Sequence, residues 1–132
     1  MNGPIPRQWT PYLQGVLRIA VALLFILHGT QKLFGVPAGP MGAVPLASKL
    51  GVAAVLETFG GLAMLLGLWT RPIAFLLSGE MAVAYFTAHA PRGSLPLLNG
   101  GELAVLYCFI YLYLMTAGPG PISLDRVLRH RS

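Results

Sequence analysis

Residues 12–34, YLQGVLRIAVALLFILHGTQKLF, form an apolar run long enough to cross a bilayer as one helix. A spanning helix needs about 20 residues, and this run carries two charged side chains, Arg18 and Lys32. Three further apolar segments follow at about 46–69, 72–89 and 96–117, separated by short stretches with Gly or Pro. The pattern predicts an all-α integral membrane four-helix transmembrane bundle, one domain over residues 1–132 with a short basic C-terminal tail.

The composition supports a membrane protein and excludes several functions. Charged residues make up 10% of the chain, against about 25% in an average soluble domain. The net charge of +5 does not indicate nucleic acid binding, because the basic residues cluster around the apolar segments. Cys108 is the single cysteine, so the chain alone forms no internal disulfide, CxxC redox pair or multi-thiolate metal site.

The distribution of Lys and Arg predicts the orientation of the bundle. One side of the predicted membrane carries Arg7, Arg71, Arg126, Arg129 and Arg131. The other side carries Lys32, Lys49 and Arg92. Since cytoplasmic loops hold the excess of basic residues, we expect both termini in the cytoplasm and the chain in the cell inner membrane. The loop 35–45 and the turn at Arg92 would then face outward.

Three of the four acidic residues, Glu57, Glu80 and Glu102, lie within the apolar segments. A charge at the bilayer centre costs at least about 2.5–3.5 kcal/mol, so each carboxyl needs a partner, a water-filled cavity or a proton. Glu57 and Glu80 are expected near the middle of the membrane, and Glu102 in the first turns of the fourth helix. We predict these three as the catalytic, proton-handling residues.

Other polar side chains are predicted in or beside the same membrane region. His28 and Lys32 are four residues apart and share a helix face. Together with the glutamates, most of these residues fall in the middle and outer half, which predicts a site that opens outward. The predicted ligand-binding residues are Arg18, His28, Lys32, His89 and Asn99. The alternative is a buried ion-pair network that fixes helix register.

The histidines and tyrosines admit a cofactor interpretation. His28 and His89 could ligate haem or copper, but no spaced metal motif accompanies them. We favour a hydrogen-bonding role, with contact to a quinone headgroup ahead of haem, and predict no metal site. Tyr107 and Tyr111 share a face of the fourth helix, which we interpret as packing.

Five stretches of the sequence carry a family resemblance. They are LRIAVALLFILHGTQKLFG (17–35), ETFGGLAMLLGLWTRP (57–72), the segment around Glu80, NGGE (99–102) and GPGPISLD (118–125). In order and spacing they resemble the DoxX family of small four-helix membrane proteins, over nearly the whole chain. The resemblance implies a single DoxX-like transmembrane domain. It also implies a redox setting, since some members are described as subunits of a thiosulfate:quinone oxidoreductase.

These observations support one main hypothesis and two alternatives. The first is a membrane subunit of a quinone-linked redox system, whose pocket binds a quinone or small electron donor while the glutamates handle protons. The alternatives are a non-catalytic anchor or assembly factor for a partner enzyme, and a carrier for a small solute or proton, for which we expect a homo-oligomer. Expected partners are the lipid bilayer and a redox or sulfur-metabolising protein; whether the chain is itself an enzyme stays open.

Overall fold

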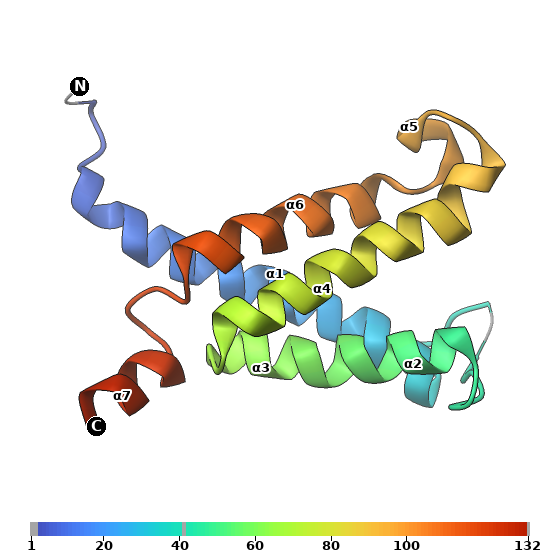
Figure 1. Ribbon diagram of the computed structural model, residues 1–132, viewed down its shortest axis with the longest axis horizontal. Helices are drawn as coiled ribbons and strands as arrows, with labels where there is room; N and C mark the ends of the chain where they lie inside the picture. The colour runs from blue at the N-terminus through green and yellow to red at the C-terminus, as the bar shows by residue number, and fades with distance from the viewer. Residues whose placement is uncertain (1–2, 41, 132) are drawn as a thin grey trace.

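The computed structural model describes residues 3–40 and 42–131, and every regular element among them is a helix. Four helical segments run back and forth, so that both ends of the chain lie at one end of the molecule (Figure 1). We call this the terminal end and the opposite one the loop end. The all-α fold predicted from hydropathy is confirmed, while the side of the membrane that each end faces stays a prediction.

Two helical segments form the first half of the chain. The first is α1 (Thr10–Phe34), preceded by the short turn η1 (Arg7–Trp9). The second is a continuous rod composed of α2 (Lys49–Val55), the π-helical turn η2 (Leu56–Gly60) and α3 (Gly61–Leu66). Gly35 ends α1 with a left-handed φ of 73°, a conformation that glycine adopts without strain.

The second half contains the remaining elements. The third segment consists of α4 (Thr70–Ala84), the π-helical turn η3 (Tyr85–His89) and the 3-10 turn η4 (Ala90–Arg92). The fourth consists of the short α5 (Pro96–Asn99) and the long α6 (Glu102–Ala117). A final helix, α7 (Leu124–Arg131), lies at the terminal end (Figure 1).

The fourth segment differs from the prediction of one helix over 96–117. Gly100 takes a left-handed φ of 76° and separates α5 from α6. The apolar α6 therefore has 16 residues and is about 24 Å long, shorter than the hydrocarbon core of about 30 Å. The other three segments, Arg7–Phe34, Lys49–Leu66 and Thr70–Arg92, are long and apolar enough to cross a membrane.

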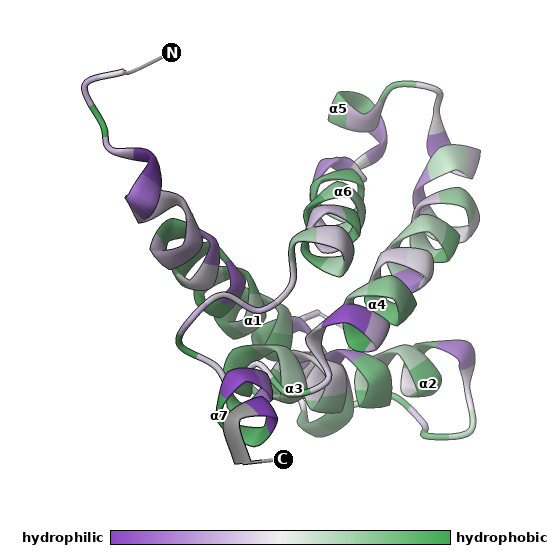
Figure 2. Ribbon diagram, turned by 60° about the vertical axis from the view of Figure 1, so that its left-hand side comes forward, coloured by the Kyte–Doolittle hydropathy of each residue, from purple (hydrophilic) through white to green (hydrophobic). Residues whose placement is uncertain are grey.

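The outer surface of the bundle is apolar on all the long helices. Large hydrophobic side chains such as Leu24, Phe75 and Phe109 are more than half exposed, and Figure 2 shows hydrophobic residues along much of each long helix. A soluble monomer rarely shows apolar patches of this extent. This surface is therefore suited to contact with the lipid of a membrane.

Close helix contacts hold each half of the bundle together. α1 packs along the rod from α2 to α3, and α4 packs along α6. A Cβ atom added to Gly29 would lie 2.5 Å from the backbone nitrogen of Thr58, and one added to Gly61 would lie 2.7 Å from Cγ1 of Ile26. At Gly29 only glycine allows the backbones to approach this closely, which brings the last turns of α1 against η2.

Gly29→Ala should destabilise the protein by about 1–3 kcal/mol, because the added methyl group meets backbone atoms of Glu57 and Thr58 as well as the Thr58 hydroxyl, and the backbone cannot move aside easily. Thermal unfolding in detergent, followed by the helical circular dichroism signal, measures the loss. Gly15→Ala, on the same helix, is the matched control, since a Cβ added there would have no atom within 4 Å. Equal stability of the two variants would contradict close packing at Gly29.

Candidate functional site

An ion pair between a half-buried lysine and a buried glutamate joins α1 to the second segment. Nζ of Lys32 donates to both carboxylate oxygens of Glu57, at 2.8 and 2.9 Å. Lys32 comes from the last turn of α1, and Glu57 lies in the π-helical turn η2 with 2% of its surface exposed. Such π turns occur frequently at functional sites. The ion pair thus links α1 to η2 inside the bundle.

Glu80 on α4 adds a second carboxyl group beside this pair. It lies close enough to Glu57 and Lys32 to interact with both electrostatically. Both of its carboxyl oxygens are buried, and no N–H or hydroxyl group among the described residues donates to either; the carboxyl group of Glu57 lies within hydrogen-bonding reach, so a proton on Glu80 would be shared between the two acids. One ammonium group therefore serves two carboxyl groups, and Glu80 is the one to which no basic group is bonded among the described residues.

Two tyrosines of α6 complete the group. Tyr107 and Tyr111 stack with their ring centroids 6.3 Å apart, and both pack edge-on against Phe25. The Tyr111 ring is fully buried, and its hydroxyl has no hydrogen-bond partner in the described residues, although Glu57 and Glu80 are close enough to interact with it. We name Lys32, Glu57, Glu80, Tyr107 and Tyr111 the carboxylate cluster.

The histidine of α1 lies next to the carboxylate cluster, and the other predicted histidine does not join it. His28 packs edge-on against Tyr107, with ring centroids 6.0 Å apart. Nδ1 of His89 lies 3.2 Å from the carbonyl oxygen of Asn99. In the described part of the chain no hydrogen bond or ring contact joins the two histidines. No group of three or more His, Cys, Asp or Glu residues with metal-binding geometry occurs in the same part.

Asn99 organises the loop end of the bundle. Its side chain is 2% exposed and donates to the carbonyl of Gly93 at 3.0 Å and to the Tyr85 hydroxyl at 3.2 Å. Its Oδ1 accepts from the backbone N–H of Gly101 at 2.9 Å. These bonds tie η3 to the break between α5 and α6. The structure thus places Asn99 and His89 in a loop-bracing group.

Two predicted site residues lie apart from the carboxylate cluster. Glu102 is exposed as the first residue of α6, where a negative charge interacts favourably with the helix dipole. Arg18 precedes Lys32 by fourteen positions, about 21 Å along an α-helix. Its guanidinium is buried and donates to the carbonyl oxygens of Pro119 and Ile122, the latter at 2.8 Å. Arg18 holds the tail at the terminal end.

Asp125 is a structural anchor that the sequence analysis did not single out. Its carboxylate accepts from the backbone N–H of Trp69 at 2.6 Å and from that of Thr70 at 2.9 Å. It therefore caps the N-terminus of α4 from a position far along the chain. The sequence signal available was its place in GPGPISLD, but a cap between distant segments has no local pattern.

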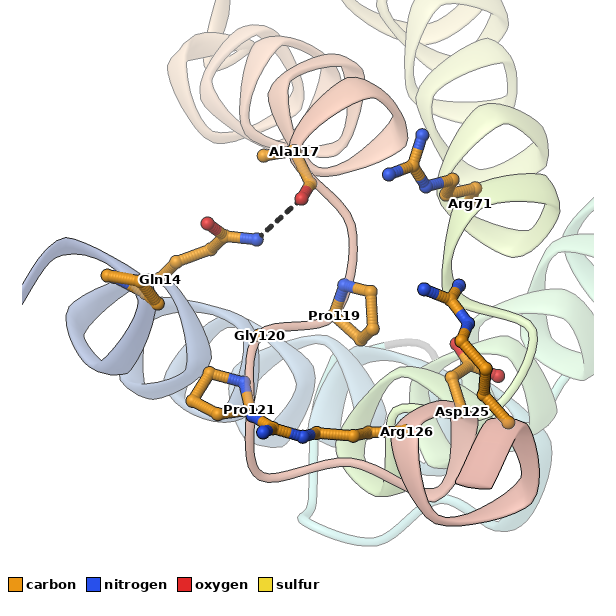
Figure 3. A pocket seen from close by; sticks show the side chains of 10 residues that line it. Gln14, Arg71, Ala117, Pro119, Gly120, Pro121, Asp125 and Arg126 are labelled. Carbon is orange, nitrogen blue, oxygen red and sulfur yellow. Dashed lines mark hydrogen bonds between the residues drawn. The ribbon is translucent and has the colours of Figure 1, made fainter. Parts of the chain in front are cut away.

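A cavity of about 520 Å³ lies at the terminal end, beside this cap. It opens between the start of α1, the start of α4 and α7, and Gln14 borders it by donating to the Ala117 carbonyl at 2.9 Å (Figure 3). None of the side chains predicted from sequence as site residues lines it. The cavity and the carboxylate cluster are thus two separate features of the bundle.

The helical fold, its apolar exterior and its buried ionisable groups define a multi-pass membrane protein. The DoxX family profile matches residues 13–90, and the chain belongs to this family. It is 48% identical over 124 residues to a protein of Haemophilus influenzae described as uncharacterized, covering 89% of this chain and 92% of that one.

Two relatives in Escherichia coli K12 carry names that give a location. The chain is 30% identical over 131 residues to the inner membrane protein YphA, with 88% of this chain and 90% of the relative covered. It is 31% identical over 125 residues to the inner membrane protein YqjF, with 88% and 92% covered. No solved structure gives a significant match.

Proposed function

We propose that this chain is the membrane component of a redox system, and that the carboxylate cluster couples the binding of a quinone or small electron donor to proton transfer. The observation that carries the proposal is Glu80, whose two buried carboxyl oxygens receive no hydrogen bond from an N–H or hydroxyl group among the described residues and which lies beside the carboxyl group of Glu57. Ionisable groups within membrane segments mark proton relays and substrate paths by default. Membership of the DoxX family supports the redox setting.

The residues of the cluster fit a ligand with carbonyl oxygens. The Tyr111 hydroxyl is buried and unpaired in the described structure, so it can donate to such an oxygen. Reduction of a quinone to a quinol takes up two electrons and two protons. In this proposal the electrons come from a donor or partner protein, and the chain's part is to hold a proton on Glu80 and deliver it. The ion pair of Lys32 and Glu57 keeps one positive and one negative charge next to Glu80.

The proposal includes an orientation. The carboxylate cluster takes Lys32 from the last turn of α1, towards the loop end. The basic residues are in excess at the terminal end, which by the positive-inside rule is cytoplasmic. The site would therefore take its ligand from the outer half of the membrane, with both termini inside the cell.

A second function, a non-catalytic anchor for a partner enzyme, is favoured by a different observation. Lys32 contacts both oxygens of Glu57, and Arg18 and Asp125 fasten the tail to the bundle. Such contacts fix helix register and a docking shape without chemistry. Under this alternative the carboxylate cluster is a structural ion pair with a spare acid.

The test compares Glu80→Gln with the matched variant Glu102→Gln, which changes an exposed glutamate outside the cluster. Purified protein in detergent is mixed with ubiquinone-1, and infrared difference spectra record the carboxyl stretching band. We expect a quinone-dependent band change in the parent protein and in Glu102→Gln, and none in Glu80→Gln. A band change that persists in Glu80→Gln, or is absent from the parent, would overturn the proposal.

Stability separates the redox function from the structural alternative. Replacing Glu80 by Met removes two buried oxygens that no N–H or hydroxyl group of the described residues satisfies, together with an acid beside Glu57, so we expect greater stability by about 1–3 kcal/mol and loss of the infrared change. Mild-detergent purification from native membranes, with mass spectrometry of the retained molecules, then shows whether the variant keeps the same partners. Lower stability and lost partners would indicate an anchor.

A further inference from the structure

The cavity at the terminal end is strongly basic. Its lining includes Arg71 from the first turn of α4 and two arginines of α7, Arg126 and Arg129. Asp125 is the single acidic residue of the lining, so three guanidinium groups and one carboxylate give a formal charge of +2. Segments more than fifty residues apart in the sequence thus bring positive charge to one hollow.

The one acid does not neutralise this charge by pairing with Arg71 or Arg126. Both carboxylate oxygens of Asp125 accept backbone N–H groups at the start of α4. Arg71 and Arg126 are exposed, and their guanidinium groups have no hydrogen bond or ion pair in the described part of the chain. Figure 3 shows them coming from different helices on two sides of the Pro119 loop. Their donors are available to an anion.

The surroundings of the cavity indicate where that anion comes from. α1 and α4 both begin there, and Trp9, Tyr12 and Trp69 are more than half exposed at this end. Aromatic residues gather at the level of the lipid headgroups. An apolar groove of about 330 Å³, lined by Trp9, Tyr12 and Leu13, lies at the same end of α1 as Pro11 of the cavity lining. A basic cavity and an apolar groove at one end of the bundle match the two parts of a phospholipid, the charged headgroup and the apolar chains.

We propose that this cavity binds the phosphate of an anionic phospholipid headgroup, with Arg71 and Arg126 as the main ligands. Guanidinium groups hold phosphate through paired, charge-assisted hydrogen bonds, and basic pockets of membrane proteins recognise anionic headgroups. The volume of about 520 Å³ lies within the usual range of ligand sites, about 300–1,000 Å³. The proposal is independent of the redox function, because the carboxylate cluster contributes no residue.

The test measures lipid binding to the purified full chain by native mass spectrometry. Phosphatidylglycerol is compared with phosphatidylcholine carrying the same acyl chains. We expect phosphatidylglycerol to bind preferentially, and the double variant Arg71→Gln/Arg126→Gln to bind it about thirtyfold more weakly. Arg92→Gln, an exposed arginine at the loop end, is the matched control and should bind as the parent does. Circular dichroism checks that the variants fold.

A soluble phosphate compound would present the same chemistry, and a competition experiment separates the two sources. Glycerol 1-phosphate and inorganic phosphate are added at millimolar concentration to the phosphatidylglycerol complex. Retention of the lipid supports the proposal, and its displacement by either compound would assign the cavity to a soluble phosphate instead. Equal binding of both lipids, or unchanged binding in the double variant, would overturn it.

Discussion

Lys32→Met should destabilise the protein more than any other single substitution in the carboxylate cluster. Glu57 is 2% exposed, and within the described residues Lys32 is the basic group bonded to it, at both carboxylate oxygens. Removing one member of a buried ion pair leaves the other charge uncompensated and typically costs about 3–5 kcal/mol. The loss is measured by unfolding in mixed micelles with increasing SDS, followed by circular dichroism.

The reverse substitution should have a smaller effect. Glu57→Gln leaves Lys32, whose side chain is 23% exposed and whose flexible stem can carry the ammonium towards water. The double variant Lys32→Met/Glu57→Met removes both charges, and its stability should return close to that of the parent. The order of stabilities is therefore the parent and the double variant first, then Glu57→Gln, then Lys32→Met.

Lys49→Met provides the control for removing a lysine as such. Lys49 is exposed at the start of α2 and forms no ion pair in the described structure, so its loss should change stability by less than about 0.5 kcal/mol. A Lys32→Met variant as stable as Lys49→Met would show that the pair contributes nothing. A larger loss in Glu57→Gln than in Lys32→Met would show that the ammonium is the more strongly buried charge.

Hydropathy predicted the helical segments well because lipid imposes a simple length requirement on each one. Their ends were also foreseeable where Gly or Pro stops a helix, as at Gly35. The fourth segment was harder. Gly100 and Gly101 are the sequence signal for a break in the helix. Because glycine is common in membrane helices, the sequence alone does not reveal that the helix ends there and begins again at Glu102.

The sequence predicted how deep the candidate site residues lie in the membrane better than it predicted which neighbours their side chains face. Lys32, Glu57 and Glu80 were all expected in the same membrane layer, and the structure brings them together. Counting residues gives depth along one helix, but it does not say which neighbour a side chain meets. For that reason Arg18 was grouped with the ligand-binding residues, although the structure bonds it to the tail.

Two features of the site depend on tertiary structure alone. The π-helical turn at Glu57 has no accepted sequence pattern, and it arises where the rod packs against Gly29 of α1. The tyrosines of α6 were interpreted as packing, and they do pack on Phe25. The unpaired Tyr111 hydroxyl becomes apparent only when its neighbours from the other helices are in place.

Arg18→Met should release the tail and lower stability by about 3 kcal/mol or more. The Arg18 guanidinium is 1% exposed and donates to the carbonyls of Pro119, Ile122 and Leu65. A hydrogen bond to a charged group contributes about 1.5–3 kcal/mol, and these carbonyls would lose their donor together. SDS unfolding measures the loss of stability of the whole bundle. The rate of trypsin cleavage measures release of the tail, because Arg126 and Arg129 lie in it.

The two readouts distinguish the roles of Arg18 and Asp125. Asp125→Asn weakens a cap worth about 0.5–2 kcal/mol, so it should speed cleavage of the tail while changing overall stability less than Arg18→Met does. Arg18→Lys keeps the charge but cannot reach several carbonyls at once, and should be intermediate. Arg7→Met, an exposed arginine at the same end, should match the parent in both assays. If trypsin cut the Arg18→Met tail at the parent rate, Asp125 alone would hold the tail, and the buried arginine would serve the contact between α1 and α3 instead.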